Sequence, residues 1–139
     1  MDHDDIAAIA EIESEALSPW SVASLAAELH VSYGGQFVAE LKSAIVGWCC
    51  FRLIEPEAEL CKIVVKREYR RQGVASSLID WVITELQSQK IKTLLLEVRA
   101  SNIEGISFYQ DHNFLQVGIR PKYYSNPPDS ALIFNKTVM

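Results

Sequence analysis

Apolar positions near the start of the chain recur with a helical period, at Ile6, Ile9, Ile12 and Ala16. This spacing predicts a helix over residues 5–17. Pro19 breaks the pattern within Ser18-Pro19-Trp20. Ser21 is a residue type that caps helices, so a second helix is predicted over residues 22–30.

The apolar residues that follow fall into short segments typical of strands. Gly34-Gly35 predicts a turn, and residues 36–41 and 44–54 predict two strands. The short polar step Lys42-Ser43 between them indicates a hairpin. A third strand is predicted after Pro56, ending at about Lys66.

A helix with one apolar face is predicted next, and that face carries Ala75, Leu78, Ile79, Val82 and Leu86. Residues 93–98 form a nearly all-apolar run, which is typical of a central strand covered on both faces. A strand, a crossover helix and a second strand of this length form a βαβ unit. The two strands of such a unit are parallel.

Asn102 can cap a short helix over residues 103–112. Residues 114–119 and 131–138 predict two more strands, separated by a surface loop over residues 123–128. The predicted order is ααβββαβαββ. We therefore expect an α/β fold with a mixed, mostly antiparallel sheet, one central parallel βαβ pair and helices on both faces.

Length and composition limit the classes of protein that this chain can belong to. Its 139 residues, 49% hydrophobic and 22% charged, fit a single domain over residues 1–139. It has no run of 18 apolar residues and no basic, apolar leader, so neither a membrane span nor a signal peptide is predicted. We expect a cytoplasmic protein without membrane partners.

The distribution of charge adds to this picture. A net charge of −5 argues against direct binding of nucleic acid. Residues 1–41 carry acids and no Lys or Arg, whereas five cations crowd into residues 62–71. An acidic end that attracts a cationic substrate and a basic segment that holds an anionic cofactor would suit a transferase, and solvated helix faces explain the acids equally well.

Cysteine and histidine give no sign of a metal site. Three cysteines, at Cys49, Cys50 and Cys61, lack metal-type spacing and lie in strand-like apolar runs, so reduced core thiols are predicted. The three histidines show no paired spacing. We therefore expect no metal.

The most distinctive stretch is Arg70-Arg71-Gln72-Gly73-Val74-Ala75, between a strand and a helix. Gly73 lets the backbone turn tightly, and the first free N–H groups of the helix favour an anion. The spacing matches neither of the common glycine-rich nucleotide signatures. It predicts a phosphate cradle, with a solvated basic turn as the alternative.

The spacing R-x-x-G-x-A between a strand and a helix resembles the pyrophosphate loop of the GNAT superfamily of N-acetyltransferases, which bind acetyl-CoA. Further segments resemble the bacterial ribosomal-protein-alanine N-acetyltransferases. They are Leu96–Asn102 with Phe108-Tyr109 and Asn113-Phe114, the substrate loop Ser18-Pro19-Trp20-Ser21, and Arg120 with Tyr123-Tyr124. The likeness extends over about residues 5–138.

The resemblance implies a role for each matching position. Ile63, Val64 and Val65 would pair with the pantetheine arm of the cofactor; Arg71, Gln72, Gly73, Val74, Ala75 and Ser76 would hold its pyrophosphate; and Asn102 would contact it beyond the splayed strands. Glu97 corresponds to the proposed general base and Tyr109 to the proposed general acid. Pro19, Trp20 and Tyr124 correspond to acceptor-binding residues. Without the family, Glu97 is a solvated acid at a strand end and Tyr109 a core aromatic.

The chemistry of amine acetylation agrees with these roles. An α-amine with a pKa of about 7.7–8.0 is roughly one-tenth neutral at pH 7, so Glu97 needs only to complete its deprotonation. A lysine amine, with a pKa of about 10.4, would demand a stronger base. Proton transfer from an unshifted Tyr109 to the thiolate is uphill by about 2 kcal/mol, which favours a hydrogen bond to the leaving sulfur.

The resemblance implies an acetyl-CoA-dependent enzyme that acetylates a protein N-terminus, namely the alanine of a small-subunit ribosomal protein. The alternatives are a small amine, a lysine or several N-termini as acceptors, or a non-catalytic CoA-binding module. We expect a monomer or weak dimer.

The chain departs from the family pattern in three features, namely one strand and two residues. The family's first strand normally precedes the first helix, and we expect this edge strand to be missing here, because the predicted first helix begins within five residues of Met1. Either the chain is naturally short or Met1 is an internal start. Ala75 replaces a commoner glycine, and Ser18 stands where a bulky aromatic residue often precedes Pro-Trp.

Overall fold

The computed structural model of the chain describes residues 1–16 and 18–139. Its helices are α1 (Ile6–Glu13), α2 (Val22–Glu28), α3 (Val74–Ser88) and α4 (Ile103–Asp111), with 3₁₀ turns η1 (His3–Asp5) and η2 (Arg67–Tyr69). Its strands are β1 (Gly34–Leu41), β2 (Ala44–Ile54), β3 (Glu57–Val65), β4 (Thr93–Arg99), β5 (Leu115–Ser125) and β6 (Pro128–Thr137). The predicted order of helices and strands is confirmed.

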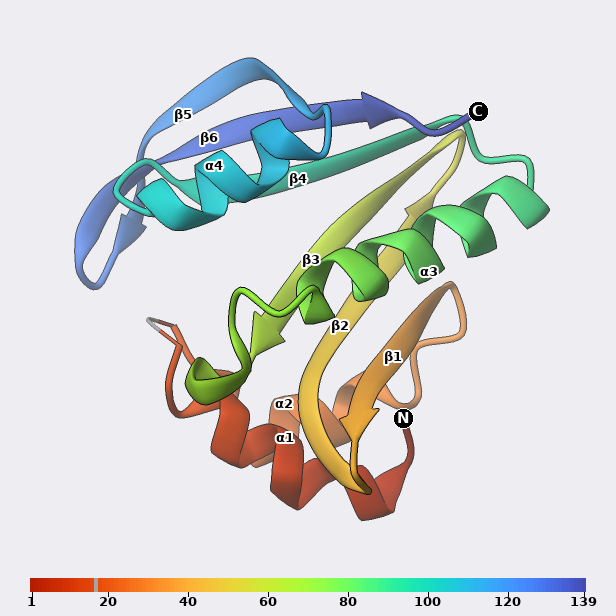
Figure 1. The fold of residues 1–139 in the computed structure, drawn as a ribbon. Helices are drawn as coiled ribbons and strands as arrows, with labels where there is room; N and C mark the ends of the chain where they lie inside the picture. The colour runs from red at the N-terminus through yellow and green to blue at the C-terminus, as the bar shows by residue number, and fades with distance from the viewer. Residues whose placement is uncertain (17) are drawn as a thin grey trace.

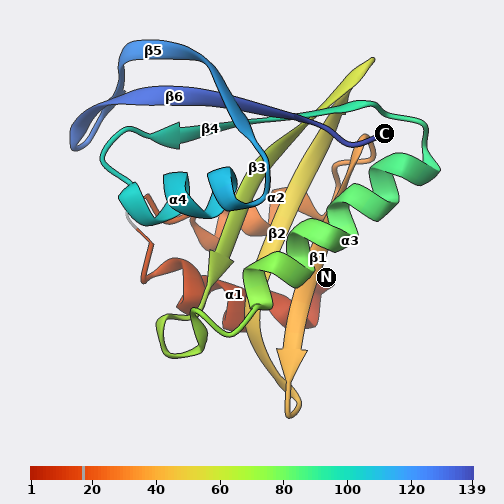
Figure 2. The ribbon, with the colours of Figure 1, turned by 45° about the horizontal axis from the view of Figure 1, so that its top comes forward.

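The six strands form one sheet in the order β1-β2-β3-β4-β6-β5, and only β3 and β4 pair in parallel. Helices α3 and α4 lie on one face and α1 and α2 on the other (Figures 1 and 2). The predicted fold class is therefore confirmed. Strand β1 forms one edge of the sheet, with no further strand of the described residues beyond it.

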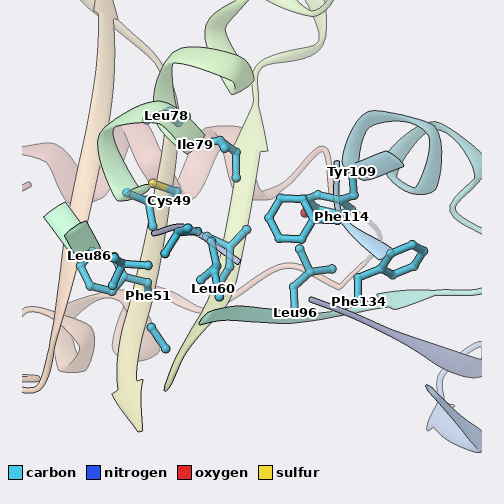
Figure 3. Close-up of a cluster of buried hydrophobic side chains, with 14 of the residues drawn as sticks. Cys49, Phe51, Leu60, Leu78, Ile79, Leu86, Leu96, Tyr109, Phe114 and Phe134 are labelled. Atoms are coloured by element: carbon cyan, nitrogen blue, oxygen red, sulfur yellow. The ribbon is translucent and has the colours of Figure 1, made fainter. Parts of the chain in front are cut away.

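The larger core lies between the sheet and helices α3 and α4. The buried face of α3 carries Val74, Leu78, Ile79, Val82 and Leu86. These side chains meet Phe51 and Leu60 of the sheet, while Leu96 and Phe134 pack near Tyr109 and Phe114 (Figure 3). Burial of this apolar surface fixes α3, and with it the loop that precedes its first turn.

A second core fills the opposite face of the sheet, where Ile6, Ile9 and Ile12 of α1 and Leu25 of α2 pack on Trp48, Cys50 and Val64. All three cysteines are free thiols. Burial raises the pKa of Cys49 to about 12, so this thiol stays protonated at neutral pH. None of the helices in the described ranges is long and apolar enough to cross a membrane.

The predicted turn at Gly34-Gly35 is wrong, because both residues begin strand β1. A Cβ atom on Gly34 would clash with the Phe51 carbonyl oxygen, and one on Gly35 would lie 2.7 Å from the Phe51 ring. The glycines therefore permit a close approach of two strands. The predicted hairpin at Lys42-Ser43 is confirmed, and both residues have positive φ, of 51° and 68°.

Two predicted boundaries also differ from the structure. Helix α1 ends at Glu13, short of the predicted residue 17, and Leu17 itself lies outside the described residues. The predicted loop over residues 123–128 is mostly a hairpin, in which Tyr124 pairs with Asp129 and Ser125 with Pro128. Cross-strand pairing between β5 and β6 overrides the local turn signal there.

The feature that positions the functional site is a split in the middle of the sheet. Strands β3 and β4 pair only from Glu57↔Thr93 to Leu60↔Leu96, and then diverge into a V (Figure 1). The pairing of β3 with β2 skips Cys61, which marks a β-bulge where the divergence begins. Beyond it, the facing backbone groups of β3 and β4 do not pair with each other.

Candidate functional site

A cleft of about 910 Å³ opens where β3 and β4 diverge, bounded by the end of β3, the loop before α3 and helix α4. It brings together ten of the residues predicted to hold the cofactor or to act in catalysis. They are Ile63, Val64, Val65, Arg71, Gly73, Val74, Ala75, Ser76, Asn102 and Tyr109. Residues distant in the sequence therefore share one cavity.

The loop before α3 turns tightly through two positive-φ residues, Arg71 (φ 62°) and Gly73 (φ 85°). Helix α3 begins directly after Gly73, with no side-chain cap among the described residues, so its first N–H groups point toward the cleft end of the helix. The Arg70 Nε donates to the Val65 carbonyl at 3.0 Å and ties the loop to β3. A loop of this geometry can hold an anion with backbone N–H groups alone.

If the loop holds the pyrophosphate of acetyl-CoA, as the resemblance implies, Gly73→Ala weakens binding of acetyl-CoA about tenfold and lowers Tm by about 4 °C, since the left-handed conformation costs a residue with a Cβ about 1 kcal/mol. No neighbouring atom lies within 4 Å of the added Cβ, so the cost is conformational rather than a clash. Equilibrium titration and thermal unfolding measure the two effects. Gly118→Ala, on β5 and outside the cleft, is the control; equal losses in both variants would contradict a special role for Gly73.

Two predicted phosphate-loop side chains are placed differently. The exposed Arg71 guanidinium lies 3.5 Å from Glu104 of α4, across the mouth of the cleft. Such an exposed pair contributes little to stability, so Arg71 is available to an anionic ligand. The Gln72 amide instead donates to the Glu68 carbonyl at 3.3 Å, and Gln72 does not line the cleft.

Helix α4 forms the far wall of the cleft. The Asn102 side chain accepts a hydrogen bond from the Gly105 N–H at 2.9 Å and caps the helix, as predicted. At the other end, His112 contacts the Ser76 hydroxyl at 3.0 Å and the Phe108 carbonyl at 2.8 Å. His112 thus joins α4 to the first turn of α3.

Tyr109 projects from α4 into the base of the cleft and is only 9% exposed. Its ring makes edge-on contacts with Phe108 and Phe114, and no described residue hydrogen-bonds with its hydroxyl. Burial raises the pKa of Tyr109. The phenol therefore remains protonated and can donate a hydrogen bond.

Glu97 lies on the opposite face of the sheet from Tyr109. Its neighbours in β4, Leu96 and Val98, belong to the same core as Tyr109, and strand side chains alternate between faces. The Glu97 carboxylate lies 3.4 Å from Arg120 and its side chain is 20% exposed. Glu97 and Tyr109 can therefore reach one ligand only through the gap between the diverging strands.

The predicted acceptor residues lie on the Glu97 face. The Trp20 ring packs edge-on against Trp48, 5.5 Å between centroids. The Tyr124 ring lies 4.1 Å from the Arg99 guanidinium carbon, and burial, followed by the charge of Glu97, raises the pKa of Tyr124. Pro19 is exposed beside Trp20. None of the three predicted residues lines the cleft between β3 and β4.

Sequence reasoning missed several residues that the structure places at the site, namely Glu13, Lys62, Arg99 and His112. Glu13 is fully buried, and burial raises its pKa although Lys62 lies 3.4 Å away. In the sequence, the only sign of such a role is a polar residue that stands between the apolar residues of a strand or helix. Within the described ranges, no group of three or more His, Cys, Asp or Glu could hold a metal ion.

Comparisons with known proteins agree with this geometry. The Acetyltransferase (GNAT) family model matches residues 6–114. The [ribosomal protein bS18]-alanine N-acetyltransferase of Escherichia coli K12 is 33% identical over 121 residues, covering 86% of this chain and 81% of that protein.

Two crystal structures share the fold. The ribosomal-protein-S18-alanine N-acetyltransferase from Escherichia coli has a TM-score of 0.89 at 29% identity, covering 99% of this chain and 90% of that one. Ard1 from Thermoplasma volcanium has a TM-score of 0.93 at 25% identity, covering 100% and 95%. Both comparisons extend over nearly the whole of this chain.

Proposed function

We propose an acceptor for this chain, which belongs to the acetyltransferase (GNAT) family and is an acetyl-CoA-dependent N-acetyltransferase. The proposed acceptor is the N-terminal α-amine of a protein, specifically the alanine of a small-subunit ribosomal protein. One observation carries this proposal: the split sheet separates a cleft with an anion-binding loop from a carboxylate on the opposite face. An acyl donor and an amine can then meet in the gap from opposite sides.

The cofactor side of the split suits a long molecule with a diphosphate. We infer that the unpaired backbone edge of residues 63–65 hydrogen-bonds to the pantetheine arm, as a strand pairs with a neighbour. The N–H groups that begin α3 hold the diphosphate, and Arg71 exchanges Glu104 for a phosphate oxygen. The 910 Å³ cleft and its unpaired strand edge support this assignment.

On the acceptor side, Glu97 is the proposed general base. The attacking amine must be neutral, and a carboxylate in the gap can accept its proton directly or through a water. Arg120 currently lies at the carboxylate, as a cation in the place where an acceptor ammonium would bind. The acceptor would therefore displace Arg120 from Glu97.

Tyr109 is the proposed partner of the leaving sulfur. It approaches from the cofactor face, and burial raises its pKa, so transfer of its proton to a thiolate is less favourable than for a free phenol. A hydrogen bond from the phenol to the sulfur is favoured instead. That bond strengthens as negative charge develops on the sulfur, which stabilises the transition state.

The choice of an α-amine follows from the pKa of the amine. A carboxylate in the gap has to deprotonate only part of an amine with a pKa near about 8, but nearly all of one with a pKa near about 10.4. Similarity to an enzyme named for the alanine of ribosomal protein bS18 supports a ribosomal acceptor.

The test uses two short peptides with the bS18-type N-terminal alanine, one with a free and one with a blocked N-terminus, each with an internal lysine. We expect release of CoA from acetyl-CoA only with the free N-terminus, because only the α-amine is partly neutral at pH 7. A thiol-reactive dye measures the release. Equal turnover of both peptides would assign lysine as the acceptor, and turnover of neither would point to a small amine.

A further inference from the structure

Arg99, at the end of β4, is a buried arginine that forms no salt bridge with the described residues, although its charge helps to lower the pKa of Asp129. It is 8% exposed. Its guanidinium donates to the Ser18 hydroxyl at 2.9 Å and to the Pro127 carbonyl at 2.8 Å. Burial of a charge costs free energy. Because Arg99 is nevertheless buried and bonds to neutral acceptors on two separate segments, we infer that it holds these segments in place.

The first of these segments is the loop between α1 and α2. Ser18 is held from both arms of the V: its hydroxyl accepts from Arg99 of β4, and its carbonyl accepts from Lys62 of β3 at 2.9 Å. Lys62 is in turn 3.4 Å from the buried Glu13 of α1. The loop is therefore fixed across the opening between the two diverging strands.

The second segment is the β5–β6 hairpin. Arg99 bonds to the Pro127 carbonyl in its turn, and its guanidinium lies 4.1 Å from the centre of the Tyr124 ring. Glu97 lies two positions earlier in β4 and therefore on the same face. Arg99 also lines the cofactor-side cleft, so one side chain contacts the loop, the hairpin and the gap.

From these contacts we propose that Arg99, acting through Ser18, is a positioning residue that clamps the α1–α2 loop and the β5–β6 hairpin together as the two walls of the acceptor site. This role rests on the proposed function, since it assigns the Glu97 face to the acceptor. The planar guanidinium group of arginine has several N–H donors, so it can bond to the loop and to the hairpin while it lies over the Tyr124 ring. Lysine, with a single compact charge, cannot.

The experiment compares Ser18→Ala and Arg99→Lys with wild type, using the free N-terminus peptide at saturating acetyl-CoA. Loss of a hydrogen bond to a charged group costs about tenfold in binding, so peptide KM rises about tenfold in each variant. The dissociation constant of acetyl-CoA changes less than about twofold. The control, Ser24→Ala, removes a nearby hydroxyl that contacts Ser21 rather than Arg99, and leaves peptide KM unchanged.

Hydrogen exchange on the unliganded protein gives a readout that needs no turnover. Arg99→Lys speeds exchange in the segments 18–24 and 123–129 together, whereas Ser18→Ala speeds exchange only in the first. Two outcomes would overturn the proposed role of Arg99. One is unchanged hydrogen exchange in both variants, and the other is a rise in peptide KM that is matched by an equal loss of acetyl-CoA binding. If wild type acetylates no peptide, the proposed acceptor is wrong, and the exchange pattern alone decides whether the two walls are clamped.

Discussion

Replacement of Glu97 by glutamine is expected to lower kcat about a hundredfold at pH 7 and to leave binding of acetyl-CoA unchanged. The amide keeps the shape of the side chain but cannot accept a proton from the amine, and general-base catalysis typically contributes at least this factor. Glu97 lies on the opposite face from the cofactor-side cleft, so the cofactor does not depend on its charge. Steady-state kinetics and an acetyl-CoA titration measure the two quantities.

The pH dependence of the same variant separates a base from a residue that only binds the acceptor. Without Glu97, the enzyme must capture amine that is already neutral, and that fraction rises from roughly one-tenth at pH 7 to about half near pH 8. Activity of Glu97→Gln should therefore recover about fivefold over that interval. The matched control is Glu59→Gln, on the same face of neighbouring β3 but in the region where the strands still pair. Full turnover in Glu97→Gln at pH 7 would remove the base assignment.

Replacement of Tyr109 by phenylalanine is expected to lower kcat about thirtyfold, the equivalent of about 2 kcal/mol for a lost hydrogen bond to a charged sulfur. The ring keeps its edge-on contacts with Phe108 and Phe114, so Tm should change by no more than about 2 °C. The loss should fall on kcat rather than on the acceptor KM, because the bond is made as charge develops.

The Tyr109 prediction also has a pH signature. Burial raises the pKa of the phenol, so it keeps its proton above pH 10 and does not ionise between pH 8 and 9.5. Wild-type activity should not decline in that interval through Tyr109. The matched control is Tyr69→Phe, which removes a hydroxyl from another tyrosine that lines the cleft. Equal losses in both variants would show that a hydroxyl in the cleft, rather than this position, is required.

Much of the fold was predictable because its signals are local. The apolar stripe of α3, the run in β4 and the glycine of the phosphate loop each report the environment of their own segment. The wrong predictions occurred where pairing partners decide. Gly34 and Gly35 extend β1 because Phe51 approaches closely, and Tyr124 and Ser125 lie in β5 because β6 pairs with them.

The candidate site followed a similar division. Ten of the predicted cofactor and catalytic residues line one cleft. Nine of them lie where a strand ends or a helix begins, and the topology brings those ends together, whereas Tyr109 lies near the end of α4. The side chain of Gln72 turns away toward Glu68, which spacing alone does not reveal. The sequence placed Glu97 and Tyr109 in one reaction but did not show that they approach from opposite faces of the sheet.

The sequence by itself determined the order of the elements, the parallel pair and the chemical character of the loop before α3, because backbone propensity and apolar period are properties of neighbouring residues. Only the tertiary structure decided the split between β3 and β4, the face on which Glu97 lies and the contacts of Arg99. The Arg99–Ser18 hydrogen bond joins residues 81 positions apart. Such a contact exists only after both cores have packed, because the packing of the two faces, rather than any local preference, brings those side chains within reach.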